Sequence, residues 1–181
     1  MGNDVVRIGV TGHIRLTRGS LRPIYRALVQ VLRAQLRLHG AVHGVTCFAE
    51  GTDRLFARAV SDLAGTFEVV LPGPPDNGRQ TRRLLQRARR VTHVTPHQTP
   101  EFRYAAASEQ MLQSCDLLVA VWDGAQNGTH GGTAYTVARA RELGKPVQVV
   151  WPRKAKRRRQ VGGGSMSDSS RIPAAAARTS G

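Results

Sequence analysis

The segment from Asp116 to Pro152 constrains the fold more than any other part of the chain, because it holds two apolar strand-like runs separated by a glycine-rich loop and a helix. The runs are Leu117–Trp122 and Val147–Trp151. Continuous apolar strands joined through a helix are typical of a parallel sheet that is covered on both faces. In such sheets ligands bind at the carboxyl ends of the strands, where the glycine-rich loop would lie.

This glycine-rich loop predicts an anion site. Glycines stand at positions 124, 128, 131 and 132. They let backbone N–H groups approach an anion, and the helix that follows adds partial positive charge at its N-terminus. We therefore expect a phosphate, and hence a nucleotide, beside Gly131, Gly132 and Thr133. A glycine-rich surface turn without a ligand is the alternative that the sequence leaves open.

The rest of the chain shows the same alternation of apolar strand and helix. Such alternation predicts an α/β fold, with a Rossmann-like, doubly wound and mostly parallel sheet in a single domain over residues 1–152. The expected strands are 5–10, 42–48, 67–71, 91–94, 117–122 and 147–151, and the expected helices are 19–38, 54–63, 79–90, 104–114 and 134–143.

Beyond Pro152 the composition changes to Arg, Gly, Ser and Ala, which predicts a disordered basic tail over residues 153–181 that is dispensable for folding. The formal net charge of the chain is +15. The tail holds eight Lys and Arg residues and one Asp, so residues 1–152 are basic as well. Excess positive charge favours phosphorylated ligands and polyanions without choosing between them.

Cys47 and Cys115 lack the spacing of metal ligands, and no run of about 18 apolar residues could span a membrane. The N-terminus does not have the pattern of a signal peptide. We therefore expect reduced thiols, a cytoplasmic location, no metal and no cofactor.

Three loops at strand ends should converge at one edge of the sheet, and each places a glycine next to a polar group. They are Thr11–His13, Glu50–Asp53 and Asp123–Thr133. This convergence is a stronger indication of a site than any one loop. The predicted ligand-binding residues are Thr11, Gly12, His13, Gly51, Asp53, Asp123, Gly124, Gly131, Gly132 and Thr133.

Two carboxylates are the catalytic candidates. Glu50, on a strand-end loop, could act as a general acid or base, or could be paired with an arginine. Asp123 ends a strand and could accept a hydrogen bond from a ribose hydroxyl or a base, or could cap a turn. The histidine at position 13 could donate to phosphate or be a surface residue without a task.

Six segments resemble the SLOG superfamily, which is named after the Smf/DprA and LOG proteins. They match in order and cover most of residues 7–152: RIGVTGH (7–13), AEGTDRLFARA (49–59), VVLPGP (69–74), SCDLLVAVWDG (114–124), GTHGGTAYTVARARELGKPV (128–147) and VVWP (149–152). The resemblance implies a Rossmann-like sheet that binds nucleotides or nucleotide-derived ligands at these loops, in many members as a sensor.

The LOG branch implies a second activity, the release of a base from a nucleoside 5′-monophosphate. LOG enzymes carry a glutamate three residues after the Thr of their glycine motif, and Thr136 stands at that place here. Thr136 cannot ionise and so cannot stabilise an oxocarbenium-like transition state. The rival to a binding module is thus an N-glycosidase that uses Glu50, Asp53 or Asp123 instead.

A third hypothesis is nucleic-acid binding of the DprA type through the basic helix 79–90 and the tail 153–181. The expected partner under the first hypothesis is a nucleotide or nucleotide-derived small molecule. The sequence leaves a homo-oligomer open.

Overall fold

The computed structural model describes residues 4–95, 99–126 and 130–158. It contains a six-stranded sheet in the order β4-β3-β2-β1-β5-β6, in which every neighbouring pair is parallel. The strands are β1 (Val5–Gly12), β2 (Ala41–Thr46), β3 (Thr66–Leu71), β4 (Arg90–His93), β5 (Leu117–Val121) and β6 (Val147–Val150). The predicted Rossmann-like, doubly wound parallel sheet is confirmed.

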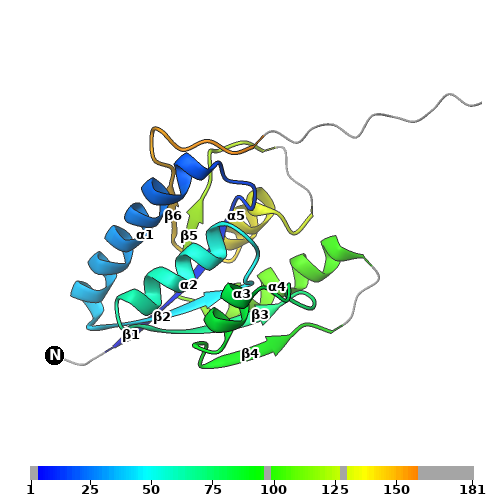
Figure 1. The fold of residues 1–181 in the computed structure, drawn as a ribbon, viewed down its shortest axis with the longest axis horizontal. Coiled ribbons are helices and arrows are strands. Elements are labelled where there is room, and N and C mark those ends of the chain that lie inside the picture. The colour runs from blue at the N-terminus through cyan, green and yellow to red at the C-terminus, as the bar shows by residue number, and fades with distance from the viewer. Residues whose placement is uncertain (1–3, 96–98, 127–129, 159–181) are drawn as a thin grey trace, which may run out of the picture.

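Helices cover both faces of the sheet (Figure 1). One face packs against α1 (Arg18–His39) and α2 (Thr52–Asp62), and the short α3 (Arg79–Leu85) lies beside α2. The other face packs against α4 (Pro100–Ser114) and α5 (Thr133–Glu142). Because side chains alternate along a strand, each face contributes to its own apolar core.

The first core lies between the sheet and helices α1 and α2; it includes Ile8 and Phe67 from the sheet and Phe56 from α2. The second core lies between the sheet and helices α4 and α5; it includes Leu118 from β5 and Met111 from α4. Burial on both faces explains why β5 reads as a continuous apolar run rather than an alternating one.

Two predicted helices have different limits in the structure. The helix expected from residue 104 begins at Pro100, where the missing N–H of proline costs no hydrogen bond in the first helical turn. The helix expected over 79–90 ends at Leu85, because Arg90–His93 pairs with β3 as the edge strand β4.

Residues 153–158 fold back onto the domain, and we call them the C-terminal strap. Leu16 and Arg157 form an antiparallel bridge, Thr17 N donates to Lys156 O, and Arg158 N donates to Arg15 O. Ala155 is 7% exposed and belongs to the first core. The ordered chain therefore extends beyond the boundary that composition suggested at residue 152; the remainder of the predicted tail, 159–181, lies outside the described residues.

The order of the strands fixes where a ligand can bind. From β1 the chain proceeds outward through β2, β3 and β4, and then returns to β5 on the other side of β1. The connections after β1 and β5 consequently leave toward opposite faces and open a crevice at the carboxyl ends of these two strands. No helix of the described part of the chain is both long and apolar enough to cross a membrane.

Candidate functional site

A cavity of about 910 Å³ lies at the carboxyl ends of the strands, at this crevice. Its walls come from four segments: the loop after β1, the loop after β2, the N-terminal half of α4, and the turn that leads into α5. The C-terminal strap closes a further side with Arg157 and Arg158. Of the predicted ligand-binding residues, it is lined by Thr11, Gly12, His13, Asp53, Gly131, Gly132 and Thr133.

The exit of β1 is held against α2 by close packing. A Cβ atom at Gly12 would lie 2.6 Å from two side-chain atoms of Thr52, so no larger residue fits there without movement. Thr52 Oγ1 in turn donates to the carbonyl oxygen of His13, at 3.0 Å. The backbone of the loop after β1 is thereby fixed at the cavity wall.

The turn before α5 supplies N–H donors. Gly132 is the N-cap residue and no side chain caps the helix; the N–H of Thr136 makes the first bond of the helix, to Gly132 O. The N–H groups of residues 133–135 therefore have no partner within the helix. Gly131 has a φ of +81°, and a Cβ there would lie 2.7 Å from Ala105 N. Glycine at 131 lets this turn pack directly on the first turns of α4.

Asp123 holds two of the cavity residues in place. Its Oδ1 lies 3.0 Å from His13 Nε2, and its Oδ2 lies 2.9 Å from Arg157 Nε. Partial burial favours the neutral acid, but hydrogen bonds from Ala125 N–H and His13, together with Arg157, lower the pKa of Asp123 overall. Asp123 does not itself line the cavity, so its role in this structure is to position His13 and Arg157.

Asp53 is a carboxylate in the cavity wall and is only 4% exposed. Burial raises its pKa to about 7, although hydrogen bonds work in the other direction, including those from Ala49 N–H and the Thr46 hydroxyl. Asp53 is the second residue of α2, whose N-cap is Gly51, so it binds the preceding loop rather than capping the helix. A carboxyl group with a pKa near neutrality can exchange a proton with a ligand.

The remaining predicted residues lie elsewhere. Glu50 is exposed and, with Gly51, lines a neighbouring groove between α1, α2 and α3. Gly124, whose φ is +85°, lies in the exposed turn after β5. Thr136 is 1% exposed and its hydroxyl lies 3.3 Å from Ser108 Oγ, so the place of the LOG glutamate is buried against α4.

Sequence reasoning missed several residues of the cavity wall. Tyr104 and Ser108 come from α4, which was expected as a helix over 104–114 but not as part of the site. Arg157 and Arg158 come from the strap, whose basic composition is typical of a solvated segment. Among the residues that the structure describes, no group of three or more His, Cys, Asp or Glu side chains is placed to hold a metal ion.

Comparisons with known proteins bear on the fold. No protein-family model matches the sequence, and no curated protein matches it significantly. Solved structures do match. The structure of DNA processing protein A (DprA) from Streptococcus pneumoniae superposes with a TM-score of 0.60 at 16% identity, over 80% of this chain and 50% of that one. The chain therefore spans about half the length of that DprA.

Two further structures match over a larger share of their own length. TM1055 gives a TM-score of 0.56 at 17% identity, over 78% of this chain and 72% of that one. The Moco carrier protein from Chlamydomonas reinhardtii gives 0.51 at 21% identity, over 83% and 79%. In fold, the chain is thus similar to DprA, to TM1055 and to the Moco carrier protein.

Proposed function

We propose that the chain binds a nucleotide or nucleotide-derived ligand in the cavity at the carboxyl ends of β1 and β5. The observation that carries this proposal is the convergence, on one cavity, of the loop after β1, the uncapped N-terminus of α5 and two arginines of the strap. Backbone N–H groups at a helix N-terminus and guanidinium groups both favour phosphate oxygens.

One of the solved structures of similar fold is a precedent for the binding of a cofactor. The C. reinhardtii protein is described as a molybdenum cofactor carrier protein. The cavity here has the size of ordinary small-ligand pockets, and Asp53, a buried carboxylate in its wall, has a pKa near neutrality. Asp53 can thus remain protonated beside an anion, which reduces the repulsion that an ionised carboxylate would cause.

A thermal-shift panel of AMP, ADP, GMP and UMP tests the proposal. A ligand at a hundredfold excess over its Kd should raise Tm by about 5–10 °C in a chain of this size. Thr133→Glu should remove the shift, since it places a carboxylate at the helix N-terminus where the phosphate would bind, while a negative charge there is favourable for the helix itself. Thr133→Gln is the neutral control of nearly the same shape. A shift that is equal in both variants would exclude this site.

A second candidate function, binding of single-stranded nucleic acid, is favoured by the groove that adjoins the cavity. Seven arginines and two acidic residues line this groove between α1, α2 and α3. It shares Arg15 and Arg158 with the cavity, so a strand could continue from one into the other. DprA from Helicobacter pylori, another structure of this fold, is described as binding single-stranded DNA.

Salt dependence separates this function from ligand binding. Affinity for a single strand should fall with a slope of about −0.7 for each phosphate neutralised, in a plot of log K against log salt concentration. Arg83→Glu with Arg87→Glu should weaken binding and flatten the slope. Arg37→Glu with Arg141→Glu is the control, because it makes the same charge change at exposed positions outside the groove. Equal losses in the two pairs would exclude the groove.

A further inference from the structure

One wall of the cavity is aromatic. His130 and Tyr104 both line the cavity, and Tyr104 is 40% exposed. The ring centroid of His130 lies 5.3 Å from that of Phe102 and 4.5 Å from that of Tyr135, with tilted planes in both pairs. These are the distances and orientations that aromatic pairs favour. Only Tyr104 and His130 of these rings line the cavity, and we call these two the aromatic wall; Phe102 and Tyr135 support the ring of His130.

The backbone holds this wall together. The turn that carries His130 packs on α4 because Gly131 has no side chain: a Cβ there would lie 2.8 Å from Glu101 O and 3.0 Å from Tyr104 Cβ. Phe102 and Tyr104 stand on the same stretch of α4, and Tyr135 lies in the first turn of α5. A ring from α4, Phe102, and a ring from α5, Tyr135, therefore flank His130 in the turn before α5.

The exposed ring of His130 is held by an aromatic neighbour. Phe102 is 57% exposed although it is large and apolar, and it abuts the exposed His130. Of these two rings, His130 lines the cavity and Phe102 packs against it. A flat ring of a ligand could stack on His130 and Tyr104, because every nucleobase has a π-face that aromatic side chains attract.

The groups proposed to bind the anion line the same cavity. They are the loop after β1 and Arg157 of the strap, with the N-terminus of α5 next to the aromatic wall. We propose that the cavity is specific for a ligand with a planar heteroaromatic ring and an anionic group, and that the ring lies against Tyr104 and His130. This inference rests on the proposed function. It adds the orientation of the ligand in the cavity and the requirement that the ligand carry a planar ring.

Calorimetric titration of the full chain with AMP and with ribose 5-phosphate tests the ring requirement. Both probes carry the same phosphate, and only AMP carries a base. AMP should bind about 5- to 100-fold more tightly, which is the range expected for stacking of one base. His130→Ala and Tyr104→Leu should each remove much of that advantage and leave the affinity for ribose 5-phosphate unchanged. His39→Ala, at the end of α1 on the opposite edge of the sheet, is the matched control.

The possible outcomes are distinguishable. Equal affinity of the parent for AMP and ribose 5-phosphate would overturn the ring requirement but leave the anion site standing. An AMP preference that survives in both wall variants would overturn the placement of the ring. If neither AMP, GMP, UMP nor ribose 5-phosphate binds, the proposed function fails and this inference fails with it. Loss of folding in a variant is recognised by its near-UV circular dichroism, and His130→Leu or Tyr104→Ala then replaces it.

Discussion

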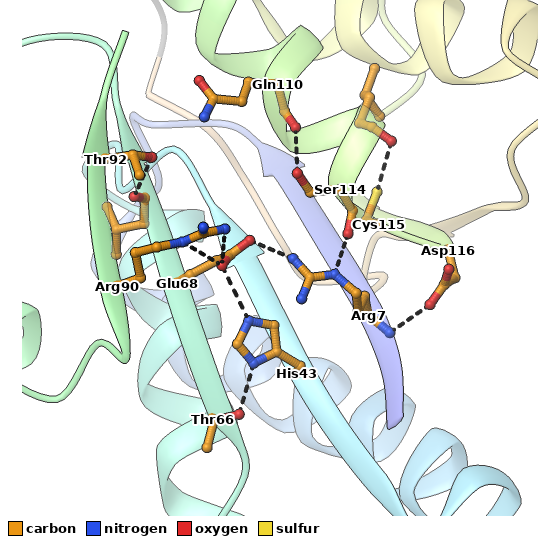
Figure 2. Close-up of polar contacts among 12 residues, drawn as sticks. Arg7, His43, Thr66, Glu68, Arg90, Thr92, Gln110, Ser114, Cys115 and Asp116 are labelled. Atoms are coloured by element: carbon orange, nitrogen blue, oxygen red, sulfur yellow. Dashed lines mark hydrogen bonds and ion pairs between the residues drawn. The ribbon is translucent and has the colours of Figure 1, made fainter. Parts of the chain in front are cut away.

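The guanidinium group of Arg7 on β1 lies 2.5 Å from the carboxylate of Glu68 on β3, across the width of β2. The other oxygen of Glu68 accepts a hydrogen bond from Arg90 on β4, at 2.9 Å (Figure 2). Burial favours the neutral acid, but the charges and hydrogen bonds of Arg7 and Arg90 lower the pKa of Glu68 overall. The carboxylate thus links three strands at the amino half of the sheet.

We expect Glu68→Gln to destabilise the fold by about 1–3 kcal/mol, because it leaves two guanidinium groups beside a neutral amide. The lowered pKa means that the ion pairs contribute fully above the ordinary value of 4.5 and are lost as pH falls below it. The difference in Tm between parent and variant should therefore shrink below about pH 4. Glu109→Gln, which breaks the more exposed pair with Arg139, should cost about 1 kcal/mol or less. An equal loss of stability in the two variants would contradict the view that Glu68 holds three strands together.

His43 belongs to the same cluster as Arg7, Glu68 and Arg90, and the sequence alone did not predict this. It pairs in register with Arg7, its Nδ1 lies 2.7 Å from Thr66 Oγ1, and burial followed by the charge of Arg7 lowers its pKa. In the sequence, Arg7 reads only as an interruption of an apolar strand, because the partners lie on other strands. Strand order brings them together, and no local pattern contains that order.

Most of the fold could be predicted, because strands that are buried on both faces have continuous apolar sequences that are easy to recognise. The site was predicted in part for a similar reason: a glycine beside a polar residue at a strand end marks a loop that reaches the crevice. The sequence could not separate Glu50 from Asp53. They stand three residues apart in one loop, yet the positive φ of Gly51 turns Asp53 inward and leaves Glu50 exposed.

The contribution of Asp53 to stability should change with pH in the direction opposite to that of Glu68. Its pKa of about 7 in the folded state means that the folded chain keeps a proton that the unfolded chain loses near 3.8. This proton's contribution to stability is complete at low pH and is lost as pH rises toward 7. The Tm of the parent minus that of Asp53→Asn should therefore fall between about pH 4 and pH 7 and then become constant. The slope is at most about 1.4 kcal/mol per pH unit. A difference that rises over this range would contradict the neutral-range pKa.

The C-terminal strap should contribute to both stability and binding. A chain that ends at residue 153 loses the buried Ala155 and the backbone hydrogen bonds to Arg15 and Thr17. We expect a loss of about 1–3 kcal/mol, which corresponds to about 3–10 °C in Tm. The matched control is a chain that ends at residue 158, which keeps every described contact and should unfold close to the full chain. A chain ending at 153 that is equally stable would show that the strap is dispensable, as the composition had suggested.

The last prediction concerns base release from AMP. We expect little or no free adenine, because the side chain at the place of the LOG glutamate, Thr136, is neutral and buried against Ser108. Loss of one electrostatic stabiliser of a transition state typically costs about 10²–10³ in rate. Thr136→Glu should not restore activity, since its carboxylate would be buried in the contact between α4 and α5 and should lower Tm instead. If chromatography detects turnover by the parent, Asp53→Asn should abolish it and Glu50→Gln should not, because Asp53 lines the cavity and Glu50 lies outside it. Turnover that depends on Glu50 would contradict this arrangement, and robust turnover by the parent would favour an N-glycosidase over a binding module.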